Sequence, residues 1–238
     1  VVGLTVTGTY QPGTEDTISA TAGANISEAT IGLVDALDIN HSAGAFTMTL
    51  EQHNAMSFIN TGGAQTVVLT TAGATSTKSG IENYEILEGT TLTISSSTDD
   101  VNVKENGTVG TVSTLNIGGR ALTGNFDGFD TTDVLRVTQT ANISGASGDG
   151  VTAGTALGFG TLDFADTDGV TLTMTQAQHQ GLPTVNNTVG EQTFEITTDG
   201  DITARDGIEN YLLSDAGNAI TVNSDEAGVD IPGGAGAD

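Results

Sequence analysis

The chain of 238 residues contains the sequence Gly-Ile-Glu-Asn-Tyr twice, at 80–84 and at 207–211. The match extends beyond this pentapeptide, because "FTMTLEQHNAM" at 46–56 corresponds to "LTMTQAQHQGL" at 172–182. An active site is normally built once per domain, whereas a motif that returns together with its neighbours indicates architecture. Tandem duplication of this kind is typical of proteins built from stacked structural units.

The duplication divides the chain into two comparable parts. We expect a first β-repeat with its trailing segment over 1–118 and a second β-repeat over 119–238. The second part ends in "GGAGAD" at 233–238, which has the form of a partial Gly-Gly-x-Gly-x-Asp motif.

Apolar residues alternate with polar ones over short runs in both copies. Val67 and Leu69 show the pattern in the first copy, and Phe194 and Ile196 show it in the second. Such alternation, bounded by Gly, Asn and Asp, predicts short β-strands. Only 4% of the residues are aromatic, so the core must consist largely of Val, Ile, Leu and Ala. We therefore expect an all-β protein.

One departure from the strand pattern occurs in each copy. Thr49 and Gln52 have the spacing of a helix capping box, and Thr175 and Gln178 repeat it. In this box the threonine side chain and the glutamine side chain satisfy each other's backbone N–H groups at the start of a helix. The sequence thus predicts one or two helical turns that interrupt the strands.

Two architectures suit short strands of this composition. One is a parallel β-solenoid or β-roll-like stack of tandem repeats with short helical turns, and the other is a pair of antiparallel β-sandwich domains. Tight hairpin signals are scarce, and the best of them is "KENGTVG" at 104–110. Because the connections between strands are uneven in length, the solenoid is the preferred interpretation.

The duplicated pentapeptide predicts a corner of the repeat. Gly80 and Gly207 are expected to open a turn that needs a positive φ, and the isoleucine after each of them should re-enter the core. We expect Tyr84 and Tyr211 to lie on the opposite face, where the phenol can still reach water.

The charge of the chain is strongly negative, with 30 acidic residues against 5 basic ones and a formal net charge of −25. Five cations are too few to neutralise a phosphate backbone, so nucleic acid is excluded as a partner, and an anionic membrane surface is excluded for the same reason. No apolar run approaches the roughly 18–20 residues of a membrane-spanning helix, so membrane insertion is not expected.

Clusters of aspartate in Gly-rich turns are the most credible binding sites. Ca²⁺ takes about six to eight oxygen ligands, and such turns supply carboxylates and carbonyls together. The alternative interpretation of each cluster is a solvated turn. The predicted calcium ligands are Asp127, Asp130, Asp133, Asp163, Asp166, Asp168, Asp199, Asp201 and Asp238.

Catalytic signals are weak. His41, His53 and His179 have no His or Cys at metal-ligand spacing, so we expect polar residues on exposed turns. The chain has no Gly-x-Ser-x-Gly nucleophile elbow and no phosphate-binding Gly-Lys-Ser/Thr sequence. A polysaccharide lyase or hydrolase is the least favoured alternative, because the chain has no Trp to stack on a sugar. We therefore expect a protein that is not an enzyme.

The stretches "DTISATAGANISEATIGLVDALDI", "TMTLEQHNAM" and "GIENYLLSDAGNAITV" resemble the repeats of large exported bacterial surface proteins, those of S-layers and of adhesins of the repeats-in-toxin (RTX) type. The terminal "GGAGAD" is similar to the first two-thirds of the RTX nonapeptide, although this chain carries one partial copy and not a series. The resemblance implies an exported, calcium-responsive β-protein that assembles or adheres.

Together these features predict a non-enzymatic structural protein, secreted to the bacterial cell surface. It would self-assemble into a surface layer, filament or matrix, with Ca²⁺ lowering the repulsion between acidic copies. The expected partners are further copies of the chain and cell-surface polysaccharide. An adhesin stalk and a carbohydrate-binding module are the alternatives.

Overall fold

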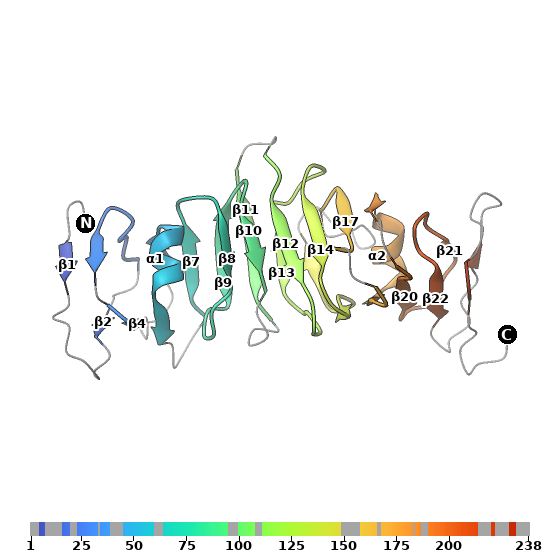
Figure 1. Cartoon of the computed structure of the whole chain (residues 1–238), viewed down its shortest axis with the longest axis horizontal. Coiled ribbons are helices and arrows are strands. Elements are labelled where there is room, and N and C mark those ends of the chain that lie inside the picture. Colours follow the sequence, from blue (N-terminus) through green and yellow to red (C-terminus); the bar gives the residue numbers. More distant parts are fainter. Residues whose placement is uncertain are drawn as a thin grey trace.

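The computed structural model shows an elongated stack of short strands, with its first described strand, Thr5–Thr7, and its last, Ile220–Thr221, at opposite ends of the stack (Figure 1). The residues that it describes are 5–7, 16–19, 23–32, 34–38, 45–59, 64–94, 100–107, 111–148, 158–165, 168–182, 184–186, 190–213, 220–221 and 229–231. No helix in this part of the chain is long and apolar enough to cross a membrane.

Two six-stranded sheets form the middle of the stack, and we call them the first and the second long sheet. The strands of the first long sheet, in spatial order, are β5 (Ala45–Met48), β7 (Thr66–Leu69), β9 (Asn83–Leu87), β11 (Asn102–Asn106), β13 (Asn125–Asp127) and β16 (Ser147–Gly148). Those of the second are β8 (Ala74–Ser76), β10 (Thr91–Thr93), β12 (Thr114–Ile117), β14 (Val134–Val137), β17 (Thr161–Asp163) and β19 (Val185–Asn186). From β7 to β14 the chain visits the two sheets in turn, so each coil contributes one strand to each.

Smaller sheets continue the stack toward both ends. Toward the C-terminal end lie β15 (Ala141–Asn142), β18 (Thr171–Met174), β20 (Thr193–Ile196) and β22 (Asn210–Leu213), and the pair β21 (Ile202–Thr203) with β23 (Ile220–Thr221). Toward the N-terminal end lie β2 (Thr17–Ser19), β4 (Ala36–Asp38) and β6 (Ser57–Ile59), and the pair β1 (Thr5–Thr7) with β3 (Thr30–Gly32).

All pairings between these strands are parallel. This confirms the parallel β-solenoid and overturns the alternative of two antiparallel sandwiches. The hairpin signal at 104–110 is also wrong, since β11 and β12 belong to different long sheets. The chain leaves each strand around a corner and returns one coil later beside it.

The two sequence copies share both long sheets. The boundary at 118/119 lies between β12 and β13, yet β13 pairs with β11 through Phe126 and Val103, and β14 pairs with β12 through Leu135 and Leu115. These four side chains are buried, with at most 2% of each exposed. The apolar interior therefore runs through the junction without a break.

Inward-pointing residues line up in columns because the strands are stacked in register. Tyr84 lies between Val67 and Val103 in the first long sheet, and all three are buried. The corresponding column of the second long sheet contains Leu92 and Leu115. In the first of these columns a large ring thus lies between two valines, and this alternation of size fills the interior with little wasted volume.

The two predicted helical turns are confirmed as α1 (Leu50–Ala55) and α2 (Gln176–Gly181). Thr49 and Thr175 are the N-cap residues, both with φ −80° and ψ 157°, and both capping boxes are complete. This identity of backbone geometry shows that the sequence duplication is a structural duplication.

The capping glutamines also join each helix to the preceding coil. Gln52 Nε2 donates to the carbonyl oxygens of Ile26 and Ala29, both at 2.8 Å. In the second copy, Gln178 Nε2 donates to the carbonyl oxygen of Ile143 at 2.7 Å and to that of Ala146 at 3.1 Å. One amide thus caps the helix with its oxygen and fixes the neighbouring coil with its nitrogen.

The expectation for the two tyrosines was wrong. Tyr84 and Tyr211 point into the core, with 1% and 0% of each exposed, although the glycines before them have the predicted positive φ of 82° and 81°. Each phenol oxygen accepts a backbone N–H, that of Lys78 at 2.7 Å or that of Arg205 at 2.6 Å. Internal backbone donors therefore replace the water that the phenols were expected to need.

The expectation of exposed histidines was also wrong for the two that the structure describes. His53 and His179 lie on α1 and α2 with at most 1% of each exposed, whereas His41 lies outside the described residues. Burial, with a smaller contribution from Lys78 or Arg205, lowers the pKa of each imidazole to about 4. Both side chains are neutral core residues at physiological pH.

Candidate functional site

The predicted calcium ligands around 127–133 are largely engaged in holding a turn. Asp133 is fully buried, and its carboxylate accepts the backbone N–H of Ser113 at 2.8 Å and that of Asp130 at 2.7 Å. Asp130 in turn accepts the backbone N–H and the hydroxyl of Thr132, both at 2.7 Å. These contacts are those of turn-forming aspartates.

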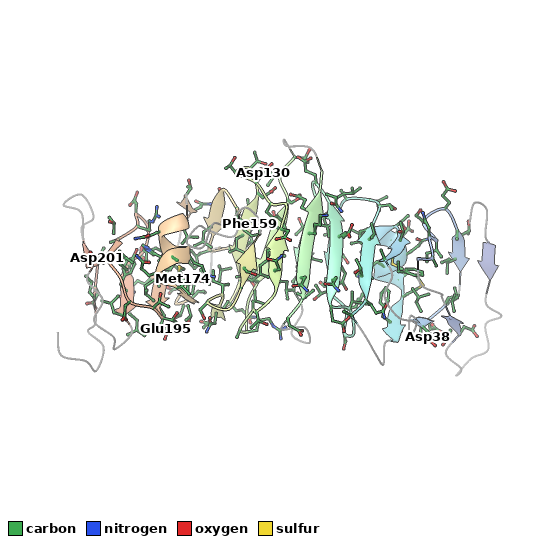
Figure 2. All side chains as sticks on the ribbon, turned by 180° about the vertical axis from the view of Figure 1, so that it is seen from behind. Asp38, Asp130, Phe159, Met174, Glu195 and Asp201 are labelled. Atoms are coloured by element: carbon green, nitrogen blue, oxygen red, sulfur yellow. The ribbon has the colours of Figure 1, made fainter. Side chains whose placement is uncertain are left out.

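The remaining predicted ligands are spread along the stack. Asp163 forms an ion pair with Arg136 at 2.6 Å, and Asp168 accepts the backbone N–H of Glu191 at 2.9 Å. Asp199 and Asp201 are exposed, and Figure 2 shows Asp201 far from Asp130 along the long axis. Asp166 and Asp238 lie outside the described residues.

Within the described ranges, no three His, Asp or Glu side chains form a group that could hold a metal ion. Calcium binding therefore stays a prediction. The observed contacts support the solvated or turn-forming interpretation for the aspartates whose partners are known.

A groove of about 390 Å³ lies on the outer face of the first long sheet, across β7, β9, β11 and β13. Alternation along the strands places Tyr84 and Val103 inward and leaves polar side chains outward. We call this feature the polar groove and define it by Asn83, Glu85, Asn102, Lys104, Asn125 and Asp127.

Three asparagines form one column of the polar groove. Asn102 Nδ2 donates to Asn83 Oδ1 at 2.9 Å, and Asn102 Oδ1 accepts the backbone N–H of Asn125 at 2.8 Å. The Ser147 hydroxyl extends the column by donating to Asn125 Oδ1 at 3.0 Å. These amides are held in place before any ligand arrives.

Charged residues of alternating sign form the second column. Lys104 is in register with Glu85 on one side and with Asp127 on the other. Glu85 accepts the side-chain amide of Asn106 at 2.9 Å, and Asp127 Oδ2 accepts that of Asn125 at 2.6 Å. Asp127 Oδ1 is buried and has no hydrogen-bond partner in the described part of the chain.

A pair of buried acids lies at a corner between the long sheets. The Ser113 hydroxyl donates to Glu105, while the Ser113 backbone N–H donates to Asp133. Burial raises the pKa of Glu105 to about 7, with the Asp133 charge adding to the rise and the Ser113 hydrogen bond opposing it. Glu105 is thus partly protonated at neutral pH, and this corner responds to pH.

Sequence reasoning missed both the polar groove and this acid pair. The alternation in "GIENYEIL" groups Asn83 with Glu85 on one face, but the expectation that Tyr84 reaches water turned that face inward. The strands beside it were not readable from the sequence. Glu105 lies inside the supposed hairpin at 104–110, which concealed its inward orientation.

Comparison of the chain with protein-family models, with curated proteins and with solved structures finds no match.

Proposed function

We propose that this chain is a non-enzymatic, rod-forming segment of an exported bacterial surface protein, and that its copies assemble end to end into a surface layer, filament or matrix. The observation that carries the proposal is the uninterrupted strand pairing across the junction of the two sequence copies. A unit that stacks on its neighbour inside one chain can stack on a further unit in the same way.

The junction indicates where a further copy would be added. In the first copy, the backbone N–H of Asn102 donates to the carbonyl of Glu82 at 2.7 Å, and β13 of the second copy pairs with the other side of β11. Asp230 occupies the equivalent place in the second copy, where its N–H donates to Glu209 at 2.7 Å. The position beyond Asp230 is therefore where the next copy would pair.

We expect assembly to depend on calcium, and the experiment below tests this condition. A net charge of −25 opposes the approach of copies, and a divalent cation between acidic turns would reduce this repulsion. Because the described acids form no metal-binding group, no step of the assembly is assigned to a particular calcium ligand.

The first test is the particle mass of the purified chain, measured by light scattering in about 5–10 mM CaCl₂, above the usual extracellular affinity range, and then in EGTA. Growth into filaments or sheets supports the proposal, and reversal by EGTA supports the calcium condition. A particle that keeps the mass of one chain at every protein concentration and in both buffers would contradict self-assembly.

A variant makes the test specific to the end of the stack. Because Asp230 uses its N–H and its carbonyl toward β22, the N–H of Ile231 points the other way. Ile231→Pro removes this outward donor and leaves the observed bonds in place. We expect the variant to fold normally and to assemble less than the parent chain, whereas equal assembly would place the contact elsewhere.

A further inference from the structure

We propose that the polar groove binds a neutral polysaccharide that lies along the stack. This inference goes beyond the assembly role and does not depend on it.

The strands under the groove leave only side chains for a ligand to contact. β9 pairs with β7 and β11, and β11 pairs with β9 and β13. Their backbone donors and acceptors are therefore used within the sheet. A peptide that binds by adding a strand needs a free edge, and β7, β9, β11 and β13 under the groove are each paired on both sides.

The chemistry of the groove favours hydroxyl groups. Its outward side chains are amides, carboxylates, one ammonium group and the hydroxyl of Thr66, so they offer donors and acceptors but no apolar anchor. Glu85 and Asp127 flank a single Lys104, which disfavours an anionic polymer, as does the net charge of −25. A neutral, hydroxyl-rich chain fits this mixture of donors and acceptors.

Comparison of the two sequence copies distinguishes the residues that the fold uses in both copies from the groove charges that occur in one. Asn83 and Tyr84 return as Asn210 and Tyr211, which build the corner and the core in both copies. The groove charges do not return, because the residue equivalent to Glu85 is Leu212 and the one equivalent to Lys104 is Pro232. β22 pairs with β20 with Leu212 at this position, so the strand does not require the charge of Glu85. The charges of the groove are thus a feature of one place in the sequence.

The groove also has the periodicity of an extended polymer site. Neighbouring parallel strands lie about 4.8 Å apart, so the column of Glu85, Lys104 and Asp127 offers a charged group at each step along the stack. The asparagine column beside it is already ordered, which lowers the entropy cost of binding.

The test is affinity electrophoresis of the whole chain in gels containing dextran, β-1,3-glucan, mannan or xylan, with alginate as an anionic comparison. Two variants remove groove charges: Glu85→Leu, which introduces the residue found in the second copy, and Lys104→Gln. Lys78→Gln is the control for Lys104→Gln, since it removes the same positive charge outside the groove. Circular dichroism confirms that each variant is folded.

We expect at least one neutral polysaccharide to retard the parent chain and Lys78→Gln equally. The dissociation constant should rise at least about tenfold in Glu85→Leu and in Lys104→Gln, the size expected for one lost hydrogen bond to a charged group. The proposal is overturned if none of the four neutral polysaccharides retards the chain, if alginate alone does, or if the groove variants are retarded like the parent. The gels are run in EGTA and at low protein concentration, so their outcome is independent of assembly.

Discussion

His53 Nε2 lies 3.2 Å from the phenol oxygen of Tyr84 in the core of the first copy, and His179 meets Tyr211 in the same way at 3.3 Å in the second. The Tyr84 oxygen accepts a backbone N–H from Lys78, so its own proton is available for the imidazole. His53 therefore accepts at Nε2 and carries its proton at Nδ1, which lies 2.9 Å from the hydroxyl of Thr75. The pair requires a neutral histidine.

This requirement makes the stability of the fold depend on pH. The pKa of both histidines is about 4 in the folded chain and about 6.5 when unfolded. Between pH 4 and pH 6.5 the unfolded state therefore binds protons that the folded state does not bind. The free energy of unfolding should fall as the pH decreases from about 6.5 to 4, by about 3 kcal/mol for each histidine. Urea denaturation at pH 7 and at pH 4.5 measures the effect. His53→Gln and His179→Gln should each flatten the profile, and equal slopes in parent and variants would refute this account.

Glu105 acts in the opposite direction. Its pKa is about 7 in the folded chain and about 4.5 when unfolded, so its contribution is fully present below pH 4.5 and is lost as the pH rises through 7. Glu105→Gln removes the titrating group and should stabilise the chain at pH 8 by about 1–2 kcal/mol, with no gain at pH 4. Thermal melts at the two pH values test this, and Glu51→Gln on the exposed face of α1 is the control. A gain of equal size at both pH values would show that packing, and not titration, is responsible.

The two copies differ at one partner of the buried histidines. Thr75 contacts His53 Nδ1, but the equivalent residue in the second copy is Ile202, and His179 Nδ1 has no hydrogen-bond partner in the described ranges. We expect Thr75→Val to destabilise the chain by about 1–2 kcal/mol, because it leaves the buried nitrogen of His53 unsatisfied.

The reverse exchange introduces the threonine of the first copy at position 202 of the second. We expect the Ile202→Thr variant to be at least as stable as the Ile202→Val variant. The threonine hydroxyl supplies the missing hydrogen-bond partner of His179, which offsets the cost of burying a hydroxyl in the core. Chemical denaturation of Ile202→Thr and Ile202→Val decides the point. A threonine variant less stable than the valine variant would mean that the imidazole nitrogen is satisfied in another way.

Asp133 is expected to be structural whether or not the chain binds calcium. Asp133→Ala leaves the backbone N–H groups of Ser113 and Asp130 without their acceptor and should cost about 2–4 kcal/mol. The loss should be the same in CaCl₂ and in EGTA. Asp199→Ala, at an exposed site, should change the stability by less than about 0.5 kcal/mol. A loss for Asp133→Ala that appears only with calcium would instead identify Asp133 as a ligand.

The features that depend on local sequence were predictable. The capping boxes at Thr49 and Thr175 and the positive φ of Gly80 and Gly207 follow from neighbouring residues alone. The duplication added the inference of stacked units. These predictions succeed because the interactions that enforce them lie within a few positions along the chain.

The features that depend on packing between coils were not predictable. Tyr84 was expected to face water because no sequence signal showed that the backbone of Lys78 and the ring of His53 would satisfy its hydroxyl. The polar groove needs the register of β9, β11 and β13, and a slip of one residue would turn its side chains inward. Glu105 and Asp133 meet only because two corners of successive coils coincide.

The shared sheets at the junction have a mechanical consequence. In a parallel stack, each coil is held mainly by the coils before and after it, so tension between the two ends would peel coils from the ends of the stack one at a time. Nineteen residues separate the paired Tyr84 and Val103, and twenty-three separate the paired Leu92 and Leu115. At about 3.4 Å per extended residue, each coil that peels away would release about 65–80 Å of chain in place of one strand spacing of about 4.8 Å. The stack would thus extend in steps under load and absorb work at each step, while the coils still paired keep their order.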